Sequence, residues 1–173
     1  MLHIGTYPAI APPTFKASAA AFLALLTKCK ITSKLYDDVQ PQRWTKLLIN
    51  TTWNPICALT RSRDKAFLDS SPEAEEFIED VMLEVIAVAN ACGSTSVTQE
   101  TAKSQLSRAT VREWPGVQPS MLADALDGRN MEVETIVGNV LRLAKQHGVK
   151  TPLIKTIYIL ATALNNSFTR PQN

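Results

Sequence analysis

The sequence predicts an all-α protein that is preceded by a short strand–helix–strand segment. From residue 41 almost to the C-terminus, apolar residues recur every three to four positions, which is the spacing of helices that bury one face. The alternating pattern of a half-buried strand occurs only within the first forty residues. We therefore expect three parts: residues 1–40 as the strand–helix–strand segment, 41–166 as the helical body, and 167–173 as a frayed tail.

The N-terminal segment contains two strand-like stretches around one helix. Residues 2–7 form an apolar stretch that Pro8 ends, and residues 30–36 alternate polar and apolar side chains. Between them, Thr14 can cap a helix that reaches Lys28. Its apolar run, residues 17–26, is shorter than the roughly 20 residues of a membrane span. It also follows three prolines without a basic stretch, unlike a secretory signal, so we expect an amphipathic helix with one buried face.

The helical body has recognisable start and stop signals. Ser71 precedes a proline and three glutamates, which predicts a capped helix that Gly93 ends. Thr98 can cap the next helix, over residues 99–109. A further apolar stripe runs from residue 133 to 147 and stops at Gly148, and the last helix opens at residues 151–152.

Composition excludes several classes of function. Lys and Arg number 18 against 16 Asp and Glu, and a net charge of +2 without a basic run does not suggest nucleic-acid binding. The three cysteines and two histidines are too scattered for a zinc site, and unpaired cysteines favour the reducing cytoplasm. No G-x-G-x-x-G or phosphate-binding loop is present, so nucleotide chemistry would need a domain that these 173 residues do not contain.

Three polar residues stand out in the first helix of the body. Lys46, Asn50 and Asn54 are four residues apart and therefore lie along one helix face. Two amides and an ammonium among apolar neighbours suit a small polar ligand, and lysine can also donate a proton. A solvated polar face remains the alternative. Pro55 predicts that the helix either kinks here or ends and restarts.

A second polar cluster spans residues 118–134. Ser120 stands directly before an apolar helical stretch, as an N-cap does, and Glu132 and Glu134 open the next helix after the break at Gly128. The alternative is that the serine and the two acids only cap their helices.

Three blocks of the sequence resemble one known family. RWTKLLINTTWNPICALT, PSMLADALDGRNMEVETIVG and LAKQHGVKTPLIKTIYIL, in this order and at these separations, are similar to the C-terminal domain of ketopantoate reductase (2-dehydropantoate 2-reductase). The resemblance covers roughly residues 2–164. It implies a helical domain of the phosphogluconate dehydrogenase type, which in full-length members follows an NADPH-binding Rossmann domain and serves the reduction of ketopantoate to pantoate on the route to pantothenate.

The resemblance also implies roles for five side chains. Lys46 matches the lysine that protonates the developing alkoxide, and Glu132 matches the glutamate that supports this lysine and the substrate hydroxyl. Asn50 and Asn54 match substrate-binding asparagines, and Ser120 matches the serine that contacts the substrate carboxylate. We therefore expect Lys46 and Glu132 to be catalytic and the other three to bind a small 2-oxo or 2-hydroxy acid.

One departure from the family pattern is large: residues 1–40 look like the end of a dinucleotide-binding domain without its glycine-rich loop. NADPH is thus implied by resemblance only. We expect the substrate half of a reductase that is inactive alone and needs a separate nucleotide-binding chain or a homodimer. An exposed apolar patch of Leu2, Ile4, Phe22 and Leu25 should mark where the missing domain packs.

Two other functions stay open at this point. The chain can be a non-enzymatic helical module that binds a small acid or a protein partner, or it can use Lys46 with Glu132 or Glu134 in cofactor-free acid–base chemistry. Whether it is an enzyme is therefore undecided by the sequence. We expect no nucleic-acid or membrane partner.

Overall fold

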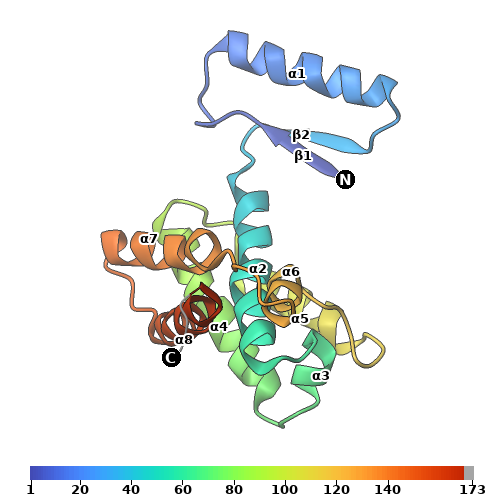
Figure 1. The fold of residues 1–173 in the computed structure, drawn as a ribbon. Helices are drawn as coiled ribbons and strands as arrows, with labels where there is room; N and C mark the ends of the chain where they lie inside the picture. The colour runs from blue at the N-terminus through green and yellow to red at the C-terminus, as the bar shows by residue number, and fades with distance from the viewer. Residues whose placement is uncertain (170–173) are drawn as a thin grey trace. The chain divides into compact units, whose positions relative to one another are not determined.

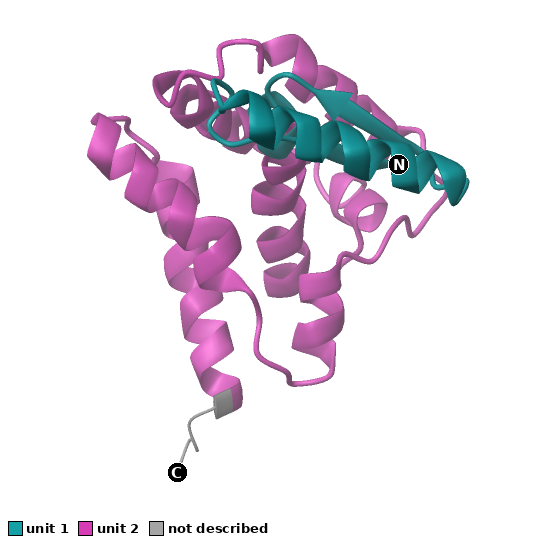
Figure 2. Cartoon of the chain, turned by 90° about the horizontal axis from the view of Figure 1, so that it is seen from above, with its two compact units in different colours: residues 1–44 teal, residues 45–173 magenta. Residues whose placement is uncertain are grey.

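A computed structural model describes residues 1–169, which form two compact units, one over residues 1–44 and one from residue 45 onward (Figures 1 and 2). Helices α1 to α8 make up most of the described chain, and a two-stranded sheet is confined to the first unit. The predicted all-α fold class with a short strand–helix–strand start is therefore confirmed.

The first unit consists of β1 (Leu2–Gly5), α1 (Pro13–Lys28) and β2 (Ser33–Tyr36). The two strands are parallel, with Leu2 opposite Ser33, because α1 carries the chain back to the starting edge of the sheet. Both strands are shorter than predicted. The helix starts at Pro13, so the predicted cap at Thr14 is wrong: Thr14 already lies in the first turn, behind a proline that favours this position.

Little of the first unit is buried. Leu26 is the one buried residue of α1, and Phe22 and Leu25 on the same helix are 48% and 56% exposed. Leu2 is 43% exposed, whereas Ile4 is partly buried. The expected exposed patch thus holds for three of its four residues. Parallel sheets are normally covered on both faces, and in the described residues α1 is the helix that packs on this sheet.

The second unit is built around α2 (Gln40–Thr60), whose first residues belong to the first unit, and α4 (Ala74–Ala91). Around them lie α3 (Asp64–Leu68), α5 (Gln99–Thr110), α6 (Ser120–Leu126), α7 (Asn139–His147) and α8 (Pro152–Thr169). Helix α4 packs against α5, α7 and α8, as its central place in Figure 1 suggests. The largest fully buried side chains come from α2, α4, α6 and α8: Leu48, Ile78, Met82, Met121, Leu122 and Ile154.

The ends of α4 and α7 and the start of α5 agree with the sequence signals, whereas the start of α4 does not. Gly93 and Gly148 have positive φ values of 89° and 68° and end α4 and α7, as expected. Thr98 is the N-cap of α5, and the Thr101 hydroxyl accepts a hydrogen bond from its N–H at 3.2 Å. Ser71 does not cap α4, which starts at Ala74; the serine instead accepts the N–H of Glu73 in the turn before the helix.

The stripe over residues 133–147 is not one α-helix. It begins with a π-helical turn, η1 (Glu134–Gly138), and continues as α7. Gly138 allows Glu134 and Tyr158 to lie close, because a Cβ there would stand 3.1 Å from Glu134 Cδ and 3.3 Å from Tyr158 Cε2. Helix α8 runs through Thr169, so the first residues of the expected tail are helical, and residues 170–173 lie outside the described chain.

The three cysteines differ in environment, which predicts their reactivity. Cys29 is exposed, Cys92 is partly buried, and burial of Cys57 raises its pKa to about 12. The thiolate is the reactive form, so at pH 8 a thiol reagent should modify Cys29 rapidly, Cys92 more slowly and Cys57 only on unfolding. Thiol counting with Ellman's reagent, with and without denaturant, checks this order. Rapid modification of all three in native protein would contradict the buried position of Cys57.

Candidate functional site

Helix α2 carries three of the five predicted site residues at increasing depth. Lys46 is exposed, Asn50 is partly buried, and Asn54 is only 6% exposed. The helix continues through Pro55, so it neither ends nor restarts there. The predicted polar face thus leads from solvent into the interior of the second unit.

The structure joins Asn54 to Ser120 directly. Asn54 Oδ1 accepts a hydrogen bond from the Ser120 hydroxyl at 3.2 Å and another from the Met121 N–H at 3.1 Å. Ser120 is the first residue of α6 rather than its N-cap, so the predicted capping role is wrong. Pro119 occupies the N-cap and has no side-chain acceptor, and the amide of Asn54 on α2 therefore satisfies a free N–H of this helix end.

The segment that contains Glu132 is attached to α2 and to α8. The buried Thr51 hydroxyl donates to the carbonyl oxygen of Ile136 at 3.2 Å, and the Met131 N–H donates to Asn165 Oδ1 at 2.6 Å. The Ile136 N–H in turn donates to the carbonyl of Glu132 at 3.0 Å. These bonds attach the residue before Glu132 to α8 and the carbonyl of Ile136, one helical turn after Glu132, to the middle of α2.

Lys46 and Glu132 do not form an ion pair: within residues 1–169, no salt bridge includes either side chain. Glu132 is exposed. Glu134, by contrast, accepts hydrogen bonds from the Tyr158 hydroxyl and from Arg142 Nη1, the latter at 2.9 Å. The Tyr158 hydrogen bond, followed by that of Arg142, lowers the pKa of Glu134 below its usual range, so its carboxylate is engaged and charged.

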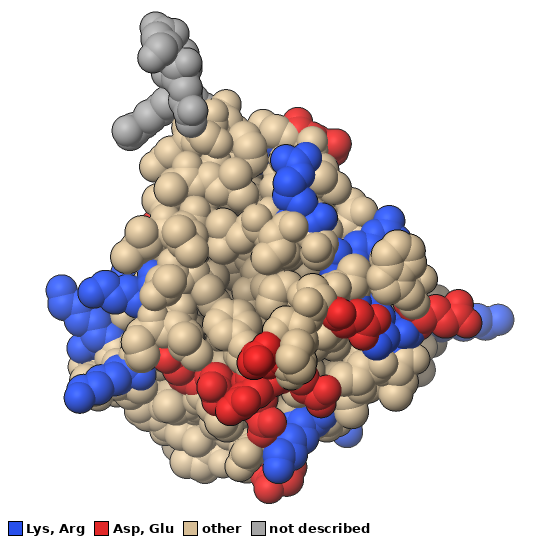
Figure 3. Space-filling view, turned by 90° about the horizontal axis from the view of Figure 1, so that it is seen from below, with Lys and Arg blue, Asp and Glu red and all other residues tan. Residues whose placement is uncertain are grey.

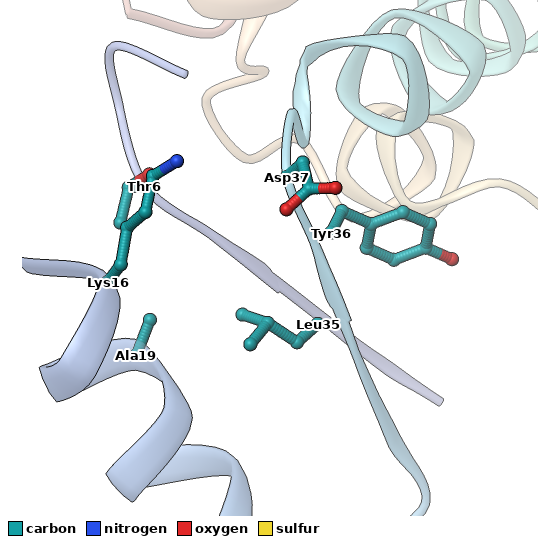
Figure 4. Close-up of a pocket in the computed structure, with 6 residues that line it drawn as sticks. All are labelled: Thr6, Lys16, Ala19, Leu35, Tyr36 and Asp37. Atoms are coloured by element: carbon teal, nitrogen blue, oxygen red, sulfur yellow. The ribbon is translucent and has the colours of Figure 1, made fainter. Parts of the chain in front are cut away.

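A hollow on the first unit contains none of these residues. It lies at the carboxyl ends of β1 and β2 beside α1 and is lined by Thr6, Lys16, Ala19, Leu35, Tyr36 and Asp37 (Figure 4). The lining is mixed, with Lys16 and Asp37 on opposite sides of the opening and the Tyr36 ring turned away from Leu35.

Acidic and basic side chains are unevenly distributed on one face of the molecule. On the face drawn in Figure 3, many of the acidic side chains gather in one band and the basic ones lie in separate groups around it. Residues 1–169 contain no cluster of three or more His, Cys, Asp or Glu side chains that could hold a metal ion. None of the described helices is both long and apolar enough to cross a membrane.

Sequence reasoning did not find Thr51, Asn165 and the Asp64–Arg112 pair. Thr51 and Asn165 each contact backbone more than thirty residues away, which no local pattern reveals. Asp64 is 2% exposed and pairs with Arg112. An acidic residue at the start of a short helix usually faces water, so only the structure shows that this one is buried.

Comparison with known proteins identifies the family. Residues 38–165 match the model described as ketopantoate reductase PanE/ApbA, C-terminal. The chain belongs to the ketopantoate reductase family. Its five candidate residues all lie within the matched range.

Two curated relatives and one solved structure illustrate the match. An uncharacterized protein of Saccharomyces cerevisiae is 35% identical over 129 residues, which are 70% of this chain and 34% of the relative. The 2-dehydropantoate 2-reductase of Vibrio cholerae is 28% identical over 77% of this chain and 44% of the enzyme. The crystal structure of 2-dehydropantoate 2-reductase from Methylococcus capsulatus superposes with a TM-score of 0.82 at 26% identity and covers 98% of this chain and 52% of that one.

The ketopantoate reductase match is partial in one direction. The chain spans between a third and about half of the length of these relatives. The similarity to the Methylococcus capsulatus structure extends over both units of this chain. The connection between β1 and α1, residues 6–12, contains Pro8 and Pro12 and no glycine, unlike the glycine-rich loops that bind phosphates. The residues present therefore do not fit the phosphates of a dinucleotide.

Proposed function

We propose that this chain is the substrate-binding and catalytic half of a ketopantoate-reductase-like oxidoreductase. The observation that carries the proposal is the convergence of α2, the start of α6 and the segment around Glu132, linked by the Asn54–Ser120 and Thr51–Ile136 hydrogen bonds. An ammonium, two amides, a hydroxyl and a carboxylate on these elements match the polar groups of a 2-oxo acid such as 2-dehydropantoate and of its reduced product.

Each group has a chemical task in this proposal. Reduction of a ketone leaves negative charge on its oxygen, which Lys46 neutralises and protonates. Glu132 holds the ammonium charged and oriented once the ligand is bound. Asn50, Asn54 and Ser120 provide uncharged hydrogen-bonding groups for the hydroxyl and carboxylate of the ligand.

The hydride comes from NADPH in this proposal, and a second domain binds that cofactor. The exposed apolar residues of the first unit, Phe15, Phe22 and Leu25 on α1, support a docked dinucleotide-binding domain, because an isolated two-stranded sheet is marginal in water. The share of the relatives' length that the chain does not span is sufficient for such a domain. The chain alone should therefore not catalyse reduction of the 2-oxo acid.

Calorimetric titration with pantoate tests the binding half of the proposal. We expect saturable binding by the chain alone, and we expect Lys46→Ala to weaken it at least tenfold because a charge-assisted hydrogen bond to the ligand is lost. Lys145→Ala, which removes an exposed lysine of α7, is the matched control and should leave the Kd unchanged. Equal effects of the two variants, or no binding to the wild-type chain, would refute the proposed site.

The open first unit also favours a second candidate, a non-enzymatic module that pairs with another protein through α1. A complementation assay distinguishes this module from the proposed reductase half. If the chain binds pantoate but never supports NADPH oxidation with a dinucleotide-binding domain supplied as a separate chain, the module is the correct description.

A further inference from the structure

Three polar side chains meet at the π turn η1, and the proposed function uses none of them. The Glu134 carboxylate accepts hydrogen bonds from the Tyr158 hydroxyl on α8 and from Arg142 Nη1 on α7, the latter at 2.9 Å. Arg142 Nη2 also donates to the side chain of Asn139, the residue whose N–H closes the π turn on the Glu134 carbonyl. We call Glu134, Arg142 and Tyr158 the clamp.

The pair Glu134–Arg142 depends on the π turn. In a regular α-helix, side chains eight residues apart point about 80° away from each other, because each residue turns the helix by about 100°. A π turn takes one extra residue into its ring, so the same two residues come within about 20° of one face. The ion pair therefore forms with the π turn and favours it over a regular α-helical turn.

Gly138 makes room for the Glu134 carboxylate. Its φ is −59°, a value that any residue adopts in a helix, so its backbone does not require glycine. A Cβ at this position would stand 2.5 Å from Glu134 Oε2 and 3.3 Å from Tyr158 Cε2. Glycine weakens a helix relative to alanine, and the passage of the carboxylate over the backbone explains its presence here.

Glu132 lies two residues before Glu134, in the stretch that leads into the π turn. Its side chain is exposed, whereas Met131 and Val133 on either side are buried. A turn without the extra residue would rotate this stretch by about 100° around the helix axis relative to α7. The direction of the Glu132 side chain therefore depends on the π turn.

We propose that the clamp positions Glu132: by holding the π turn, it directs the Glu132 carboxylate to the ligand. Glu134 is then a positioning residue and not a second acid or base. A few surface hydrogen bonds are sufficient for this task, because they only have to favour one of two conformations of a short segment. The inference rests on the proposed function, in which Glu132 acts.

A double-mutant cycle on pantoate affinity tests the inference. Arg142→Ala combined with Tyr158→Phe removes both hydrogen bonds to Glu134 and is called the clamp variant; calorimetry compares it with the wild-type chain, with Glu132→Ala and with the combination of all three changes. Glu132→Ala should raise the Kd about tenfold through loss of a charge-assisted hydrogen bond. The clamp variant should raise it about fourfold in the wild-type background and less than about twofold when Glu132 is already alanine.

Two controls separate positioning from general loosening of the fold. Lys145→Ala removes another exposed cation of α7 and should leave the Kd unchanged. The melting temperature of the clamp variant should stay close to that of the wild-type chain, because Arg142 and Glu134 are exposed. An unchanged Kd for the clamp variant, or an equal increase with and without Glu132, would overturn the inference.

A measurement without ligand tests the link between the clamp and the π turn. NMR couplings across hydrogen bonds identify the carbonyl that each amide N–H contacts. In the wild-type chain the Asn139 N–H should couple to the Glu134 carbonyl, and in the clamp variant and in Gly138→Ala it should couple to the Thr135 carbonyl, as in a regular α-helix.

The two measurements fail in different ways. An unchanged Asn139 coupling in both variants would show that the clamp does not hold the π turn, and the inference would be wrong even if pantoate binds. Absence of pantoate binding to the wild-type chain would instead refute the proposed function, and the role of the clamp toward the ligand with it, whatever the couplings are.

Discussion

Replacing Asp64 by alanine should destabilise the second unit by about 1–3 kcal/mol, the usual cost of leaving buried hydrogen-bond donors without their acceptor. The Asp64 side chain is 2% exposed and pairs with Arg112. Its Oδ1 also accepts the backbone N–H groups of Val117 at 2.7 Å and Lys65 at 2.8 Å. The substitution therefore leaves three hydrogen-bond donors without their acceptor. It also detaches the segment over residues 111–119, which leads into α6.

Thermal unfolding measures this effect, and the chain contains its own control. Asp69 lies one turn further along and pairs with Lys65 at the surface, with its side chain 44% exposed. Asp69→Ala should cost less than about 1 kcal/mol, because exposed ion pairs contribute little. Asp64→Asn keeps an acceptor oxygen and should fall between the two. Equal melting temperatures for Asp64→Ala and Asp69→Ala would show that the buried carboxylate of Asp64 does not stabilise the fold.

The parts of this fold that sequence reasoning found are those with local causes. The apolar stripe of α4 and the glycines after α4 and α7 act within one or two helical turns, so their consequences can be read directly from the chain. The π-turn at Glu134–Gly138 could not be found in this way. The apolar residues of 133–147 are compatible with one regular helix, and the extra residue in the turn depends on contacts with Thr51 and Tyr158 from distant helices.

The same distinction between local and long-range causes applies to the candidate site. The spacing of Lys46, Asn50 and Asn54 places them on one face of α2, because a single continuous helix carries all three. The hydrogen bonds from Asn54 to the start of α6 depend on the packing of α2 against α6, because Asn54 and Ser120 are 66 residues apart in the sequence. Ser120 has the same local sequence signal whether it caps the helix or binds a ligand. Sequence patterns therefore identify the polar groups, while packing determines which of them is free for a ligand.

Substitution of Lys46 by alanine should abolish most of the reductase activity of a complemented enzyme. The assay follows NADPH oxidation with 2-dehydropantoate when the part of the Vibrio cholerae relative that this chain does not cover is supplied as a separate chain. In the proposed function Lys46 protonates the developing alkoxide, so its loss should lower kcat by about 10²–10⁴-fold, the usual contribution of general acid catalysis. The lysine is exposed and lies on the polar face of α2, so its removal should not alter the melting temperature.

The variant Lys46→Arg separates the effect of positive charge from the effect of proton donation. Arginine keeps a positive charge but does not release a proton near neutral pH, so it should restore pantoate affinity while kcat stays low. Lys145→Ala, the control from α7, should retain full activity. If Lys46→Arg recovers kcat as well, the side chain at this position acts only as a fixed charge, and the proton that completes the alcohol must come from water or from Glu132. If Lys46→Ala retains full activity, α2 does not contain the acid, and the proposed division of roles between Lys46 and Glu132 is wrong.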